Sequence, residues 1–170
     1  ATFSGPLGSR DRESSRTDAI TSAQAALNIM SREIGNSGYG LSDHGIVLGG
    51  DSHANQLHFR ANLDNVGYNG ATTNQAGEDI TYYCENCSTD CTSGSVVRRD
   101  AYANSGSPAI SGIINRVSDV DFQYFDVNPS TCASPSPVAT PSANTVKVNI
   151  TLKVCLPEAR GQQSGRIETL

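Results

Sequence analysis

The chain lacks a long hydrophobic segment, since no stretch of 18 consecutive residues is entirely apolar. A membrane-spanning helix needs about 20 predominantly apolar residues, so no part of this sequence is expected to cross a bilayer. Charged residues are also scarce, at 17% of the chain, and the net charge is -5. This balance argues against the extended basic surface of a general nucleic-acid-binding protein. A local basic patch of Arg98, Arg99 and Arg116 is an alternative to the simpler interpretation, in which these arginines are solvated strand or turn residues.

Signatures of catalysis and of cofactor binding are missing as well. The glycine-containing stretches GYG and LGGD lack the lysine and the helix start that follow in a phosphate-binding loop. Asp51, Ser52 and His53 are three triad residue types side by side, but triads are assembled from distant parts of a chain. Oxygen ligands of the kind that calcium prefers gather later, without the spacing of a binding loop; they are Asp119, Asp121, Asp126 and Asn128. We therefore predict no enzyme, no cofactor and no metal site, with calcium kept as an alternative.

What the sequence does contain is an amphipathic helix, predicted over about 14–35. Apolar residues recur there at spacings of three and four, which places them in one stripe; they are Ile20, Ala23, Leu27, Met30 and Ile34. The opposite face is polar and carries Thr17, Thr21, Gln24, Asn28, Ser31 and Arg32. An isolated helix of this length is marginal in water, so the apolar stripe must be buried. Glycines at 35, 38 and 40 predict where the helix ends.

Short apolar runs follow the helix, within about 45–156. Five of them have the length and pattern of strands; they are 56–63, 79–84, 95–103, 117–126 and 145–156. The last alternates most regularly, and its apolar face is predicted to cover the helix stripe with Val146, Val148, Ile150 and Leu152. We therefore predict an α+β fold in which a long N-terminal helix packs on an antiparallel β-sheet. One domain over 10–170 is expected, because residues 1–9 contain GPLGS, a common remnant of expression-tag cleavage.

Five cysteines pose the main chemical question; they are Cys84, Cys87, Cys91, Cys132 and Cys155. Their CxxC and CxxxC spacings are typical of metal-binding sites. No second CxxC follows, however, and His44, His53 and His58 lack a paired ligand spacing. Disulfides in an oxidising compartment are the favoured interpretation, with zinc as an alternative. Because five is odd, at least one thiol is unpaired or pairs outside this chain.

Two segments resemble a known family. The phrase MSREIGNSGYG, which ends the predicted helix, is similar to the arginine-glutamate and glycine pattern of minor pilins of the PilW/PulJ type. The segment SGIINRVSDVDFQYFD resembles a strand of the same family, and the alternating strand at 145–156 resembles its penultimate strand. The cysteine-rich loop between Cys84 and Cys91 is not part of the family pattern.

The resemblance implies a structural role. Such proteins are minor subunits of type IV pili or of type II secretion pseudopili, and they contact other minor subunits and the major pilin. In this family a hydrophobic N-terminal helix holds the subunit in the inner membrane before assembly; here it would be missing, and the domain would lie in the periplasm or at the cell surface. Subunit contacts are expected on the polar helix face, at Thr17, Thr21, Gln24, Asn28 and Arg32. The alternatives are a secretion pseudopilin and a tip adhesin or DNA-uptake subunit.

Overall fold

The structure is a computed structural model and describes residues 5–64, 66, 73–89, 93–131, 133–156 and 167–170, with side chains from Glu13 onward. A single helix, α1 (Gly5–Ile34), precedes all the strands. Sheet A contains, in spatial order, β1 (Gln56–Arg60), β2 (Asp79–Glu85), β3 (Ser95–Asp100) and β4 (Ala109–Asn115). Sheet B contains β6 (Ser136–Val138), β5 (Val117–Asp126), β7 (Thr145–Cys155) and β8 (Ile167–Thr169). Every pair of neighbouring strands is antiparallel, which confirms the predicted α+β class.

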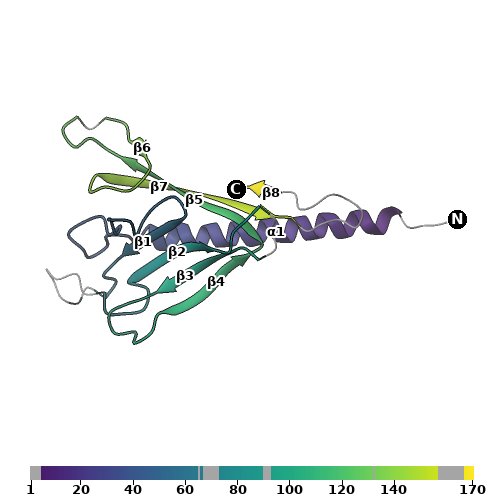
Figure 1. Ribbon diagram of the computed structural model, residues 1–170, viewed down its shortest axis with the longest axis horizontal. Coiled ribbons are helices and arrows are strands. Elements are labelled where there is room, and N and C mark those ends of the chain that lie inside the picture. Colours follow the sequence, from purple (N-terminus) through teal and green to yellow (C-terminus); the bar gives the residue numbers. More distant parts are fainter. Residues whose placement is uncertain (1–4, 65, 67–72, 90–92, 132, 157–166) are drawn as a thin grey trace.

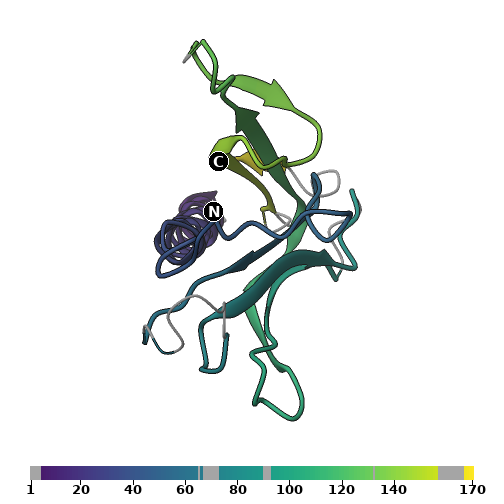
Figure 2. The same cartoon turned by 90° about the vertical axis from the view of Figure 1, so that its left-hand side faces the viewer.

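The strands form two sheets, whereas the sequence predicted one. The chain leaves sheet A at Asn115 and enters sheet B at Val117, and the single residue between them, Arg116, has a φ of 60°. A non-glycine residue in this left-handed region turns the backbone sharply, and here it turns the chain from one sheet into the other. Seen along the helix axis, the two sheets diverge and α1 lies in the angle between them (Figure 2).

The core lies where α1 meets both sheets. The most buried line of the helix is Ala23, Ala26 and Met30, each no more than 1% exposed, while Leu27 and Ile34 are partly buried at the margin of the core. The strands contribute mainly large apolar residues to this cluster; they include Leu57, Phe59, Ile80, Tyr82, Val117, Val120, Phe122, Tyr124 and Leu152. Two alanines at the centre of the contact let the helix approach the strands closely. Ala26 was absent from the predicted stripe, and Ile20 is only partly buried.

The predicted burial of the apolar face of β7 holds for only part of the strand. Leu152 is fully buried, Val148 and Ile150 are partly buried against the core, and Val146 is 57% exposed. Val146 was therefore wrongly assigned to the core. The reason is geometric: β7 diverges from α1 toward its N-terminal end (Figure 1), so its apolar side chains lose contact with the helix step by step.

The helix is longer than predicted at its N-terminal end and ends as predicted. It begins at Gly5 instead of near residue 14, and its N-terminal part extends beyond both sheets (Figure 1). Pro6 is compatible with this start, because the first turn needs no backbone N–H donor from it. After Ile34 the chain turns through Gly38, whose φ is 79° and whose N–H donates to the carbonyl of Arg60 at 2.9 Å.

Candidate interaction surface

The last turn of α1 is fixed to sheet A by a small polar network. The carboxylate of Glu33 accepts a hydrogen bond from the hydroxyl of Tyr82 at 2.6 Å and another from Nε of Arg98 at 2.9 Å. Nη1 of Arg98 also lies 3.3 Å from the carboxylate of Asp100, which in turn accepts the N–H of Gly77 at 2.7 Å. The network therefore sets the position of α1 along the strands.

Burial and charge both act on this network. Burial raises the pKa of Tyr82 well above its usual 10.0, and the neighbouring carboxylate of Glu33 raises it further. For Arg98, burial alone would lower the pKa, but the hydrogen bond and the charge of Glu33 raise it above its usual value. Tyr82 is thus a neutral donor and Arg98 a permanent cation. The carboxylate of Glu33 therefore accepts from one neutral donor and one cationic donor.

The polar face of α1 points away from both sheets, except for Ser31, which was predicted on this face but lines the groove toward β7. All five residues expected to contact other subunits are exposed; they are Thr17, Thr21, Gln24, Asn28 and Arg32. Toward its N-terminal part the helix is also linked to the domain by an ion pair between Arg16 and Glu168 on β8, at 3.2 Å. This face is accessible along the helix while the opposite face is held by the core.

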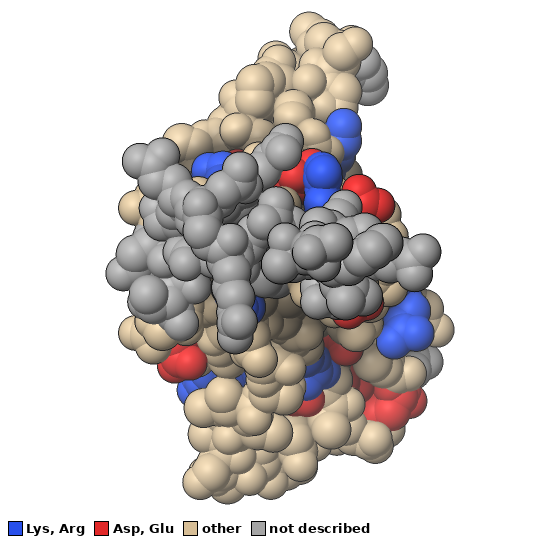
Figure 3. Space-filling model, turned by 90° about the vertical axis from the view of Figure 1, so that its right-hand side faces the viewer, with Lys and Arg blue, Asp and Glu red and all other residues tan. Residues whose placement is uncertain are grey.

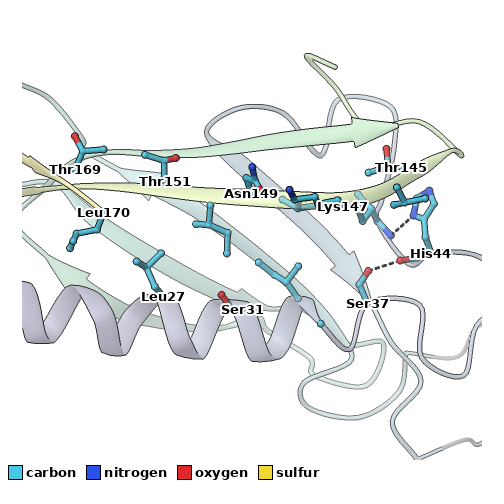
Figure 4. A pocket seen from close by; sticks show the side chains of 16 residues that line it. Leu27, Ser31, Ser37, His44, Thr145, Lys147, Asn149, Thr151, Thr169 and Leu170 are labelled. Carbon is cyan, nitrogen blue, oxygen red and sulfur yellow. Dashed lines mark hydrogen bonds between the residues drawn. The ribbon is translucent and has the colours of Figure 1, made fainter. Parts of the chain in front are cut away.

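A groove lies beside this face, between α1 and β7. It has a volume of about 1020 Å³. Leu27 and Ser31 point from the helix toward β7, Leu170 lies at one end, and His44 lies at the other (Figure 4). Its floor and walls are mainly apolar; they include Leu27, Ile34, Ile46, Val146, Val148, Ile150 and Leu170. The groove exists because β7 diverges from the helix, as described above.

The sequence neighbours Asp51, Ser52 and His53 do not form a triad. The hydroxyl of Ser52 is buried and donates to the carbonyl of His58 at 3.1 Å, while the N–H of His58 donates back to it at 3.0 Å. Ser52 therefore holds a turn against β1. Asp51 instead contributes, with His58 and Arg99, to a shallow polar pocket on the exposed face of sheet A.

Two of the three acidic residues considered for calcium, Asp119 and Asp126, are engaged with protein groups. Asp119 accepts hydrogen bonds from Asn55 and from Nζ of Lys153, both at 2.8 Å. Asp126 accepts hydrogen bonds from the hydroxyls of Ser142 and Thr145. Within the described part of the chain, no three histidine, cysteine or acidic side chains are placed to hold a metal ion together.

Two of the five cysteines form a disulfide whose partners are both described. It joins Cys84 at the end of β2 to Cys87 in the loop that follows. Cys155 at the end of β7 is buried and is also disulfide-bonded. Cys91 and Cys132 lie outside the described residues.

The three arginines considered as a basic patch are not arranged as one. Arg98 and Arg99 are neighbours on β3, and side chains alternate between the two faces of a strand. Arg98 accordingly contacts Glu33 under the helix, and Arg99 lines the polar pocket on the other face. Arg116 lies at the junction between the sheets. The alternation that defines the strand also separates these charges.

Comparison with known proteins gives no relative for this chain: no family model, no curated protein and no solved structure matches it. In the part of the chain that the structure describes, no helix is both long enough and apolar enough to cross a membrane.

Sequence reasoning missed two parts of this surface. The arginine-glutamate pair at the helix end was noted as a motif, but the hydrogen bond that Arg98 donates to Glu33 was not predicted. The available signal for this hydrogen bond was Glu33 itself, a charged residue on the partly buried side of the helix. The groove had no signal in the sequence, since it depends on the angle between β7 and α1.

Proposed function

We propose that this chain is a non-enzymatic structural subunit of a type IV pilus, which helps to prime assembly or cap the filament tip with other minor pilins. The observation that carries the proposal is the exposed polar face of α1, from Thr17 to Arg32, on a helix whose other face is fixed in the core. A helix held in this way can pack sideways against a second helix without rearranging its own domain. The similarity of MSREIGNSGYG to PilW/PulJ-type minor pilins supports the same role.

The composition of this face suits a protein partner. It consists of short polar side chains with one cation, Arg32, so a neighbouring helix can approach it closely and desolvate few charges. On the end of the molecule drawn in Figure 3, basic and acidic side chains are interspersed. Mixed charge of this kind favours a protein partner over DNA, whose binding depends on neutralising many phosphates.

The proposed location is the periplasm or the cell surface. The disulfide between Cys84 and Cys87 supports an oxidising compartment, where such bonds persist. The proposed partners are the other minor pilins and the major pilin, with the inner membrane as the site of the subunit before assembly.

A pull-down of this chain against the purified globular domains of minor pilins from the same genome tests the proposal. We expect a one-to-one complex with at least one of them. The double variant Thr21→Arg/Asn28→Arg places two bulky cations on the exposed helix face and should weaken binding by about tenfold or more, which corresponds to ~1.4 kcal/mol. The matched control is Asn104→Arg/Thr131→Arg, which makes the same changes at two exposed loop positions and should bind normally.

Each other outcome points to a different function. Binding only to subunits of a type II secretion system would identify a pseudopilin. No binding to any minor subunit, with all proteins folded, would contradict the assembly role and favour a tip adhesin. DNA binding whose affinity falls steeply with salt would indicate the DNA-uptake form of that alternative.

A further inference from the structure

One edge of β7 is only partly paired. Along its other edge β7 pairs with β5, from Thr145 to Val154. Along the edge in question it pairs with β8 at three residues, Lys153, Val154 and Cys155, and Leu152 adds a pair of backbone bonds to Leu170. From Thr151 back to Thr145, no described residue pairs with this edge of β7.

The backbone groups of two residues on this stretch are directed outward. Leu152 donates its N–H to Leu170 at 2.8 Å and accepts the N–H of Leu170 at 2.8 Å, so both its backbone groups face the edge occupied by β8. In an antiparallel strand this orientation recurs at every second residue. The N–H and C=O groups of Ile150 and Val148 therefore face the same edge. A strand edge left in this state is a template for pairing with another strand.

The side chains of the same two residues line the groove. Val148 and Ile150 face Leu27 and Ile34 of the helix, and Ile46 adds to the wall. Each residue thus offers two backbone hydrogen bonds at the edge and an apolar surface next to it. This combination is what an added β-strand requires: main-chain bonds for affinity and pockets for alternate side chains.

β8 shows which kind of occupant fits. It lies on the same edge of β7 and runs antiparallel to it, and it is followed by Leu170, whose side chain packs against the core at one end of the groove. A strand placed in line with β8 would continue the same pairing over Ile150 and Val148. Lys147 is the one charged residue among those that line the groove, and its amine stacks on the ring of Phe125. The groove therefore suits an uncharged strand with apolar residues at alternate positions.

We propose that the open edge of β7 binds an extended, alternately apolar strand of another subunit, antiparallel to β7 and in line with β8. The identity of the donor as a minor pilin rests on the function proposed above. The outer edge of β4 is not equivalent, because Ile110 there is 65% exposed and does not line the groove between α1 and β7.

A strand supplied in cis tests whether the edge accepts an occupant. The chain is extended after Leu170 by about six residues of alternating threonine and valine, long enough at ~3.3 Å per residue to pass Val148. Because the tethered strand has a high effective concentration, we expect amide hydrogen exchange at Ile150 and Val148 to slow by about tenfold or more. An extension of alternating threonine and glycine is the control and should protect these amides less. Unchanged exchange with the valine extension would overturn the proposal.

Binding in trans tests the donor, with the minor pilin domains as the probe. Val148→Lys places a charge in the groove, and Ser31→Arg, at an exposed groove position on the helix, fills it without altering β7. Both should weaken binding by about tenfold, while Ile110→Lys on β4 should not. Ser31→Arg keeps the test valid if Val148→Lys fails to fold. Normal binding by both groove variants would overturn the strand proposal and leave the assembly role intact. No binding by the unmodified chain would instead contradict the assembly role and the minor pilin donor, while the cis experiment still decides whether the edge accepts a strand.

Discussion

Glu33, in the last turn of α1, accepts a 2.6 Å hydrogen bond from the hydroxyl of Tyr82, which lies on β2 and is fully buried. The same carboxylate is paired with Arg98 on β3. Two strands of sheet A therefore bind one helical side chain, and the contact fixes both the rotation and the position of α1.

Replacing Glu33 with alanine should destabilise the domain by about 3 kcal/mol, because it leaves the cation of Arg98 and the hydroxyl of Tyr82 without their acceptor in a partly buried site. Urea unfolding followed by circular dichroism measures the loss. Glu13→Ala, at an exposed position of the same helix, is the control and should change the free energy of unfolding by about 0.5 kcal/mol or less. Equal effects of the two variants would show that the network contributes nothing specific.

Glu78 is a fully buried carboxylate that organises a loop. One oxygen accepts the N–H groups of Leu63 and Asp64, at 2.6 and 3.2 Å, and the other accepts those of Asn74 and Gln75, at 2.9 and 3.0 Å. Glu78→Gln keeps the shape but turns one acceptor into a donor that faces two N–H groups. We expect the free energy of unfolding to fall by about 2–3 kcal/mol, as measured by thermal unfolding. The control Glu85→Gln, at an exposed position, should change it negligibly.

Asp79 should make the stability of the domain depend on acid pH. Burial alone would raise its pKa, but hydrogen bonds and charge from His58 at 2.7 Å and Arg60 at 2.9 Å hold the pKa below the usual 3.8. Since the folded-state pKa is the lower one, the contribution is complete above pH 3.8 and is lost as the pH falls through the folded-state value. The free energy of unfolding of the unmodified chain should therefore decline as the pH falls below 3.8.

The free energy of unfolding of the variant Asp79→Asn should decline less steeply over the same acidic range, because the titrating group is gone. Urea unfolding at a series of pH values measures both slopes. Asp18→Asn, at an exposed helix position, is the control and should keep the slope of the unmodified chain. Identical slopes for all three proteins would contradict the assignment to Asp79.

Gly94 should tolerate no side chain. A Cβ built at this residue would overlap the carbonyl oxygen of Val117, whose N–H donates to the carbonyl of Gly94 at 3.0 Å. Because the neighbouring atoms are backbone, they cannot give way cheaply, and Gly94→Ala should cost about 3 kcal/mol or prevent folding. Gly112→Ala is the matched control, since its nearest neighbour would lie 3.9 Å away. Similar stability of both variants would contradict the close approach.

The elements of this fold follow from sequence patterns, but their arrangement does not. Short apolar runs located β1, β2, β3, β5 and β7, with alternation in β1, β5 and β7, and the glycines located the end of α1. β4 was missed because AISGIIN does not alternate, and five of its seven residues are exposed on an edge strand. The division into two sheets depends on the backbone of Arg116, and no propensity rule predicts a left-handed arginine.

The candidate surface was predictable only in part. The exposed helix face follows from the period of 3.6 residues, since polar residues on one side of a helix stay in water. The groove follows from the angle between β7 and α1, which is set by contacts distant in the sequence. Val146 illustrates the difference: the pattern assigns it correctly to the face of β7 that holds Leu152, but the pattern carries no information on how far that part of β7 lies from α1.

The position of the Glu33 network also has a mechanical consequence. It lies at the C-terminal end of α1, at the opposite end from the part of the helix that extends beyond the sheets. A pull applied to the N-terminal end along the axis would first load the exposed pair of Arg16 and Glu168, and would then travel through the helix to Glu33. There Tyr82 and Arg98 resist it in shear, together with the packed alanines and Met30. Under such a pull the domain would resist mainly at the C-terminal end of α1, where Glu33 is bound to two strands.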